Sequence, residues 1–191
     1  MEFKIPLFEN AIDVLESATM ELETYVDWTS DDIELKLLNG AMKRSIQHIT
    51  NCAELFMKFR LREKGWKYVF ENISDASEEN KRSGNFLSVK FVKGFRRLKE
   101  ECDVVMSFEN LIELYKIRNS LEHFDIKKDF KLVANALINA IKELITFCTT
   151  EIIIVLNDES DKQILKTKLE KLEKVQKDFE ELIVSEEYRK A

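Results

Sequence analysis

The sequence predicts an all-α fold, and three of its features support that class. The chain of 191 residues contains one proline and four glycines, too few for the many turns of a β-rich protein of this size. Hydrophobic residues make up 45% of the chain and charged residues 35%, a balance that is typical of globular proteins and not of disordered ones. In several segments the apolar residues recur at spacings of three and four, the period of an amphipathic helix.

The apolar pattern predicts a bundle of about five to seven helices with a long C-terminal helix. Helices are expected over about residues 7–27, 30–62, 86–101, 107–121, 128–156 and 160–190. Thr29 or Ser30 is expected to cap the second helix, because a side-chain oxygen at that position accepts a hydrogen bond from the first turn. Residues 74–85 hold no apolar side chain larger than alanine, so an exposed loop is expected there.

One domain is expected over residues 1–158, followed by a heptad-patterned helix over residues 159–191. The heptad positions of that helix are Leu165, Leu169, Leu172, Phe179 and Ile183. Gln176 interrupts them, and three to four heptads lie at the lower limit for a coiled coil. We favour a helix packed back on its own bundle, and pairing with a partner chain is the alternative.

Charge and cysteine content restrict the class of protein. A net charge of −6 argues against a general nucleic-acid coat, because such proteins use a large basic excess, although it leaves room for a local basic site. The three cysteines lie far apart and lack metal-site spacing, which favours reduced thiols and predicts neither a bound metal nor a cofactor. The chain starts without the basic-then-apolar order of a signal peptide, and its longest apolar stretch, residues 144–156, is too short to cross a bilayer. We therefore predict a cytoplasmic protein that is not in a membrane.

The run Arg118-Asn119-Ser120-Leu121-Glu122-His123 is the most chemically specific feature of the sequence. A guanidinium binds phosphate in a fork, and an imidazole transfers protons near neutral pH. Asn119 and His123 lie one turn apart on the same helix face, whereas Arg118 lies about 140° from His123. Arg118 and His123 therefore converge only if the arginine wraps round the helix or if a second chain contributes. The alternative is that Arg118 forms an ordinary surface salt bridge with Glu122.

This Arg-Asn-x-x-x-His run, preceded by Leu-Tyr-Lys-Ile late in a helical chain, resembles the Arg-polar-x-x-x-His signature of the HEPN family. Residues 52–61 also look like the helix that precedes the motif in some bacterial members. Together the two similarities cover about residues 30–155. The resemblance implies a compact helical bundle that dimerises so that two motifs face one cleft. It also implies metal-independent cleavage of RNA, in which the ribose 2′-hydroxyl attacks the adjacent phosphate.

Carried over to this chain, the resemblance makes Arg118 the phosphate-binding group and His123 the acid/base or positioning group. Asn119 fills the polar second position of the motif. The implied setting is a toxin or a phage-defence (abortive-infection) effector that acts on RNA as a homodimer, with an antitoxin or another regulatory protein as its partner. The alternative is a non-catalytic interaction module that pairs with a nucleotidyltransferase antitoxin or another partner.

A locally basic segment runs from residue 81 to residue 99 and contains seven Lys or Arg and no acid. Helical spacing predicts that Lys90, Lys93 and Arg97 share an exposed face on which RNA phosphates bind. The alternative is a solvated face that pairs with the acidic first helix.

Three further features are interpreted structurally first. His48 is expected to be a partly buried structural histidine, with a place opposite the motif as the alternative. Glu54 is expected to stabilise its helix through Lys58, and the alternative is that it orients Arg118. Trp66, Tyr68 and Phe70 are expected to be core residues and not a platform for base stacking.

Overall fold

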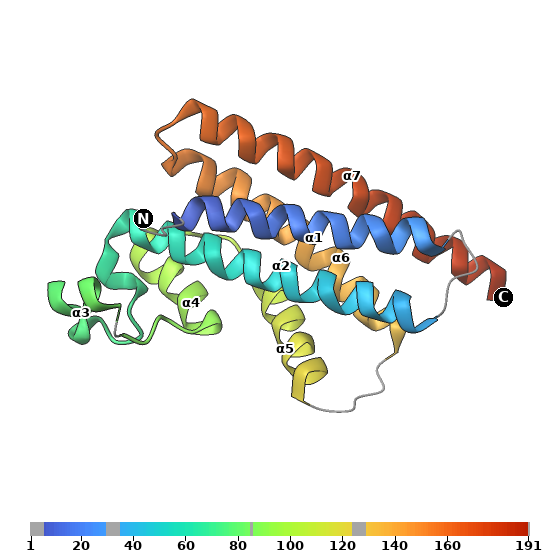
Figure 1. Cartoon of the computed structure of the whole chain (residues 1–191), viewed down its shortest axis with the longest axis horizontal. Coiled ribbons are helices and arrows are strands. Elements are labelled where there is room, and N and C mark those ends of the chain that lie inside the picture. The colour runs from blue at the N-terminus through green and yellow to red at the C-terminus, as the bar shows by residue number, and fades with distance from the viewer. Residues whose placement is uncertain (1–5, 30–34, 85, 124–128, 191) are drawn as a thin grey trace, which may run out of the picture.

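Seven α-helices and no β-strand make up the described part of the chain (Figure 1). The computed structural model describes residues 6–29, 35–84, 86–123 and 129–190, and gives only the backbone of residues 35, 123 and 186–190. The helices are α1 (Leu7–Thr29), α2 (Leu35–Lys64), α3 (Glu78–Ser83), α4 (Phe91–Cys102), α5 (Glu109–His123), α6 (Phe130–Phe147) and α7 (Glu159–Lys190). The all-α class and the long C-terminal helix are confirmed.

The four longest helices, α1, α2, α6 and α7, lie side by side and enclose most of the core (Figure 1). Helix α1 packs against α2 and α7, and α6 packs against α5 and α7. Apolar residues at helical spacing meet in the interior, where Leu15, Ile46 and Leu144 are fully buried. This arrangement leaves α5 and the segment before α4 on one flank of the bundle.

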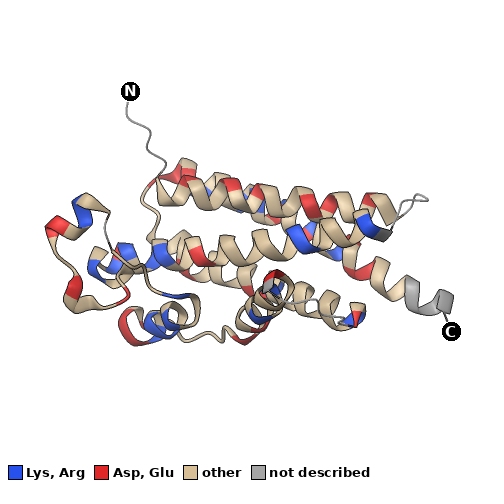
Figure 2. Ribbon diagram, turned by 60° about the horizontal axis from the view of Figure 1, so that its bottom comes forward, with Lys and Arg blue, Asp and Glu red and all other residues tan. Residues whose placement is uncertain are grey.

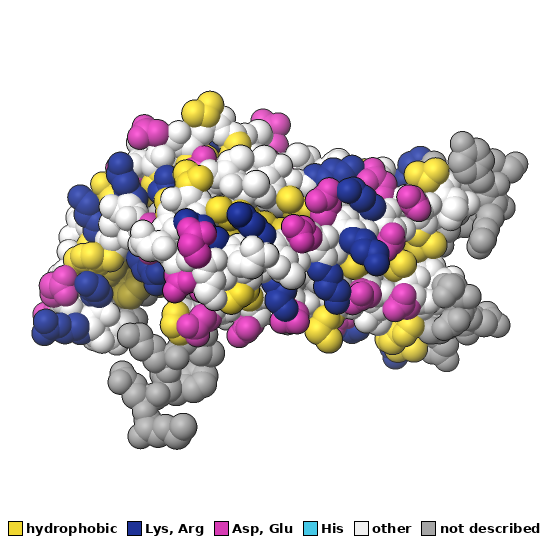
Figure 3. All heavy atoms as spheres, turned by 90° about the horizontal axis from the view of Figure 1, so that it is seen from above, with side chains coloured by type: hydrophobic (Ala, Val, Ile, Leu, Met, Phe, Trp, Pro, Cys, Tyr) yellow, Lys and Arg dark blue, Asp and Glu magenta, His cyan; other side chains and the backbone are white. Residues whose placement is uncertain are grey.

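Helix α7 packs on its own bundle. Its heptad residues are all buried: Leu165, Leu169, Leu172, Phe179 and Ile183. Gln176 is buried as well and donates a hydrogen bond to Glu180 at 2.7 Å. On the outer surface, Lys168 and Lys171 pair with Glu16 and Glu23 of α1 at 2.8 and 2.9 Å. Basic and acidic side chains alternate over this face, with no broad patch of either charge (Figure 3).

Four expected element boundaries differ in the structure. Helix α4 begins at Phe91 and not at about residue 86. Thr29 is not a cap but the last residue of α1, where its hydroxyl donates to the Tyr25 carbonyl at 2.6 Å, and Ser30 lies outside the described residues. The expected loop at 74–85 contains α3, whose cap Ser77 accepts from the Asn80 backbone N–H. The long helix expected to reach residue 156 leaves the α-helical pattern after Phe147 and continues as a π-helical turn, Cys148–Ile152, and a 3-10 turn, Ile153–Val155.

The segment between α2 and α4 is built differently from the bundle, from short turns and backbone pairing. Two 3-10 turns, Trp66–Val69 and Ile73–Asp75, precede α3. Residues before and after α3 pair through backbone hydrogen bonds, from Glu71 N–H to the Leu87 carbonyl at 2.7 Å and from Val89 N–H to the Val69 carbonyl at 2.8 Å. The resulting unit, residues 65–90, is named the α3 loop unit.

Candidate functional site

Helix α5 places the Arg118–His123 run at its C-terminal end, on the flank of the bundle (Figure 1). Three of its side chains are fully buried: Leu111, Leu114 and Ile117. At the other end of the helix, the Glu143 carboxylate of α6 accepts a hydrogen bond from the Leu111 backbone N–H at 2.8 Å, which satisfies a donor of the first turn. Burial raises the pKa of Glu143, and hydrogen bonds from Leu111 and Asn110 oppose that rise. The helix that contains the motif is therefore fixed to α6 at its N-terminal end, and the motif lies at its C-terminal end.

Arg118 is held by a short polar network that links α5 to α2. Its Nε lies 3.1 Å from Oε1 of Glu122, and the same oxygen accepts a hydrogen bond from Nε2 of Gln47 at 3.2 Å. About a quarter of each side chain of the ion pair is exposed, 23% for Arg118 and 25% for Glu122. The salt bridge considered as the alternative role of Arg118 is thus formed. Nη1 and Nη2 of Arg118 make no hydrogen bond with a described residue, so the guanidinium is positioned and keeps donors for an anion.

Asn119 and His123 occupy the same helix end as Arg118. Asn119 is half-buried, one turn before His123, which is the last residue of α5. The His123 side chain lies outside the described residues, so its distance from Arg118 stays a prediction. The helical backbone preserves the separation of about 140° between the two positions, and a second chain stays the simplest way to bring them together.

Gln47 is the residue of this network that sequence reasoning missed. It belongs to a polar strip on α2 that also contains Asn51, Glu54 and Lys58, at spacings of four, three and four. All four residues are half-buried, and they lie on the helix side away from the apolar stripe. The polar spacing was visible in the sequence, but the contact with Glu122 depends on how α2 and α5 cross.

His48 lies on the α1 side of α2, and Glu54 lies in the polar strip that contains Gln47. His48 is half-buried and follows Arg44 by one turn, and Arg44 reaches Glu21 of α1 at 2.8 Å, so His48 lies on the α1 side of α2. Glu54 pairs with Lys58 at 2.6 Å, as expected for a helix-stabilising pair.

Arg97 is not on an exposed face, and that expectation is wrong. Only 6% of the residue is exposed, and its guanidinium donates to the backbone carbonyls of Tyr68, Phe70 and Glu71. A long arginine arm can cross an apolar surface and still satisfy polar groups beyond it. Arg97 therefore joins α4 to the α3 loop unit, and binding RNA there would break these bonds.

Lys93 and Lys90 also contact Glu71, Lys93 through its side chain and Lys90 through its backbone. Lys93 Nζ donates to the Glu71 carbonyl at 2.6 Å and lies 3.1 Å from its carboxylate, which also accepts from the Lys90 backbone N–H at 3.0 Å. These bonds lower the pKa of Glu71. The Lys90 side chain is exposed and pairs with no described acid. The basic track is therefore smaller than expected, and its Lys93 pairs with Glu71 and not with the acidic first helix.

Charges of both signs are spread along the described helices (Figure 2). Within the described ranges, no group of three or more His, Cys, Asp or Glu is placed to hold a metal ion. Cys52, Cys102 and Cys148 are free and buried, and burial raises the pKa of each thiol. None of the helices in the described part is both long and apolar enough to span a bilayer.

Comparison with protein-family models, with curated proteins and with solved structures found no match for this chain. The functional argument therefore starts from the residues and their geometry.

Proposed function

We propose that the chain is a metal-independent endoribonuclease of the HEPN type that acts as a homodimer. The observation that carries the proposal is the held guanidinium of Arg118, whose Nη1 and Nη2 make no hydrogen bond with a described residue and which shares a helix end with Asn119 and His123. An arginine fixed through Nε presents its outer edge to a phosphate without first losing conformational freedom. A toxin or phage-defence role is the setting that the family resemblance implies.

The proposed reaction transfers the phosphate within the RNA. The ribose 2′-oxygen attacks the adjacent phosphorus, and the bond from phosphorus to the 5′-oxygen breaks, leaving a 2′,3′-cyclic phosphate and a 5′-hydroxyl. One proton leaves the 2′-hydroxyl and one reaches the departing 5′-oxygen, and His123 is the acid/base in this scheme. Arg118 stabilises the negative charge that grows on the phosphate oxygens, and Asn119 orients the ribose or the phosphate.

A second candidate is a non-catalytic interaction module. The Gln47–Glu122–Arg118 network favours it, because the network joins α5 to α2 and gives Arg118 a structural task. Under this alternative the same helices bind a partner protein.

The deciding experiment incubates purified wild-type protein and His123→Ala with a mixed RNA pool in the presence and absence of EDTA. We expect cleavage that persists in EDTA, yields 2′,3′-cyclic phosphate ends and is lost by at least about a hundredfold in the variant. Lys116→Ala is the matched control, because Lys116 is an exposed residue of the same helix that pairs only with Glu113, at 3.6 Å, among the described residues. Intact RNA with the wild-type protein would favour the interaction module, and equal cutting by both proteins would refute the assigned site.

A mixing experiment tests the dimer. If one site takes Arg118 from one chain and His123 from the other, a heterodimer of Arg118→Ala and His123→Ala retains one complete site. Mixing the two inactive variants after dissociation should therefore restore part of the activity. If the mixture stays inactive while co-purification of differently tagged variants shows mixed dimers, both groups act from the same chain.

A further inference from the structure

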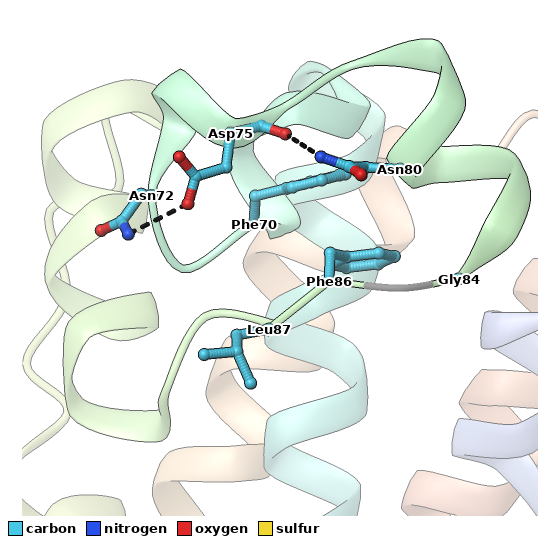
Figure 4. Close-up of a pocket in the computed structure, with 7 residues that line it drawn as sticks. All are labelled: Phe70, Asn72, Asp75, Asn80, Gly84, Phe86 and Leu87. Atoms are coloured by element: carbon cyan, nitrogen blue, oxygen red, sulfur yellow. Dashed lines mark hydrogen bonds between the residues drawn. The ribbon is translucent and has the colours of Figure 1, made fainter.

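A cavity of about 360 Å³ lies within the α3 loop unit (Figure 4), and none of its lining residues belongs to the Arg118 motif. It is lined by Phe70, Asn72, Asp75, Asn80, Gly84, Phe86 and Leu87. In Figure 4 the rings of Phe70 and Phe86 lie one above the other, with Asp75 and Asn80 on one side of the pair and Leu87 on the other. An apolar, aromatic floor with a polar rim is the usual lining of a small-molecule site.

The aromatic residues that line the cavity are fixed by packing and by hydrogen bonds to their backbone. Phe70 is buried and stacks on Phe86 with 4.1 Å between ring centroids, and Trp66 packs edge-on against Phe70 at 5.5 Å. Arg97 fixes the backbone on both sides of Phe70 through the carbonyls described above. Phe86 is half-buried and Leu87 is 77% exposed, so a ligand can reach both. Of the three aromatic residues expected in the core, Phe70 is buried, Tyr68 packs partly buried against the core, and Trp66 is only half-buried. The accessible ring of the stacked pair is Phe86.

The polar rim is rich in hydrogen-bond acceptors. Asn72 Nδ2 donates to Oδ2 of Asp75 at 3.1 Å, and Asn80 Nδ2 donates to the Asp75 carbonyl at 2.8 Å. Each amide thereby uses a donor, while its Oδ1 accepts no hydrogen bond from a described residue. The Asp75 carboxylate accepts single bonds from Asn72 and Ser74, which leaves lone pairs on both of its oxygens. The rim therefore suits a flat ring that presents adjacent N–H donors.

We propose that this cavity binds an unpaired guanine base of single-stranded RNA. Guanine alone among the four bases has two neighbouring donors on its pairing edge, N1–H and the 2-amino group, which a carboxylate accepts together. Its O6 takes an N–H that the asparagine amides still have to offer. Proteins read unpaired RNA bases by bonding their pairing edges and by packing them against aromatic side chains, and here the selectivity comes from the edge bonds to Asp75 while Phe86 forms part of the wall.

The chemistry of the rim argues against other occupants. A phosphate or another anion would meet the Asp75 carboxylate, and an aliphatic side chain would leave the carboxylate and both amides without partners. Asp75 is the single carboxylate of the lining, which is too few for a dedicated cation site.

The cavity lies along one flank with the motif. Ser88, next to Leu87, accepts a hydrogen bond from Lys58 at 3.0 Å, and Gln47 at the other end of the polar strip reaches Glu122. Lys58 and Gln47 are eleven positions apart, about 17 Å along α2. The RNA context rests on the proposed ribonuclease, whereas the base preference rests on the cavity alone.

The test titrates the full chain by calorimetry with five nucleoside 5′-monophosphates: GMP, IMP, AMP, CMP and UMP. GMP should bind most tightly, and IMP, which lacks the 2-amino group, should bind about tenfold more weakly. Quenching of Trp66 fluorescence in a Trp28→Phe background places the ligand, because Trp66 packs on Phe70 and Trp28 lies on α1. Equal binding of all five nucleotides, or no binding, would overturn the proposal.

Asp75→Asn should lower the affinity for GMP about tenfold, so that GMP no longer binds more tightly than IMP. Glu79→Gln is the matched control, since it removes one exposed acid of α3 outside the cavity lining and should leave binding unchanged. Leu87→Ala removes part of the wall at an exposed position, so it weakens binding without threatening the fold. If Asp75→Asn and Glu79→Gln behave alike, the carboxylate does not read the base and the proposal fails.

These titrations are independent of cleavage. Guanine-selective binding by a protein that cuts no RNA would support the proposed guanine site and refute the proposed ribonuclease activity. Metal-independent cleavage without discrimination among the nucleotides would refute the guanine site and support the ribonuclease activity. If both hold, Asp75→Asn should redistribute the cut sites relative to guanines without abolishing cutting.

Discussion

The long-helix bundle and the α3 loop unit of this chain are stabilised by different kinds of contact. In the bundle, α7 is held by a continuous row of buried apolar side chains, while its charged residues pair on the surface with α1. In the α3 loop unit, short turns are held by polar side chains that reach backbone groups, above all by Arg97. The first kind of contact tolerates small displacements, whereas the second depends on the position of individual atoms.

This difference bears on function, because both candidate sites lie where polar groups set the geometry. Arg118 is positioned by Glu122 and Gln47, and the proposed base site is built on the segment that Arg97 fixes. Under both proposals the bundle provides the support, and the reacting or binding groups lie on its flank. Three substitutions test this division of roles.

The largest effect is expected for Phe179→Ala in the bundle. Phe179 is fully buried on α7 and packs edge-on against Tyr25 of α1 at 5.4 Å. Its truncation leaves a cavity between two long helices and should lower the free energy of unfolding by about 3–5 kcal/mol. Urea denaturation measures the change, with the exposed Met20→Ala of α1 as the control. A loss below about 1 kcal/mol would mean that α7 is not an integral part of the bundle.

Arg97→Met should have a smaller and local effect. The substitution keeps an apolar arm but leaves three backbone carbonyls without their donor. We expect it to lower the free energy of unfolding by about 2–3 kcal/mol. Hydrogen exchange should speed up over residues 65–90 while α1, α6 and α7 keep their protection. Arg96→Met is the matched control, because exposed Arg96 pairs only with Glu100 among the described residues, at 3.6 Å. Uniform loss of protection in all helices would remove the distinction between the two regions.

The smallest effect is expected at the junction of α5 and α6, and it depends on pH. Burial raises the folded-state pKa of Glu143 above its ordinary value of 4.5, so the folded protein holds this proton more tightly than the unfolded chain does. Stability from this group is therefore fully present below pH 4.5 and falls as the pH rises toward the folded-state pKa. Gln in its place does not titrate.

Melting temperatures of wild type and Glu143→Gln, measured from pH 4 to pH 8, check this prediction. The stability of the variant relative to wild type should increase with pH and then level off. Glu113→Gln, which removes an exposed acid of α5 paired with Lys116, should run parallel to wild type apart from a small offset. A constant difference between wild type and Glu143→Gln would show that Glu143 titrates normally.

The long helices could be predicted from the sequence because their apolar residues repeat with the helical period over many turns. The heptads of α7 predicted the residues it buries, and Gln176 interrupted the pattern yet is buried with a hydrogen bond to Glu180. Errors concentrated where one or two residues decide a boundary. Thr29 has the right chemistry for a cap, but α1 ends on it.

The Arg97 error has a single physical cause. Helical periodicity placed Arg97 with Lys90 and Lys93, and a charged residue was assumed to face water. The three carbonyls that Arg97 satisfies belong to residues almost thirty positions earlier in the chain. Their need for a donor becomes visible only when the α3 loop unit folds over α4.

The sequence by itself determined the helical class, the core faces of the long helices and the residue types of the Arg118–His123 run, because these depend on local periodicity and composition. Tertiary structure alone decided that Gln47 and Glu122 hold Arg118, that Arg97 leaves the surface, and that Asp75, Asn80 and Phe86 line one cavity. The physical reason is that polar contacts between distant segments depend on how helices cross and loops fold back, and neither has a period in the sequence.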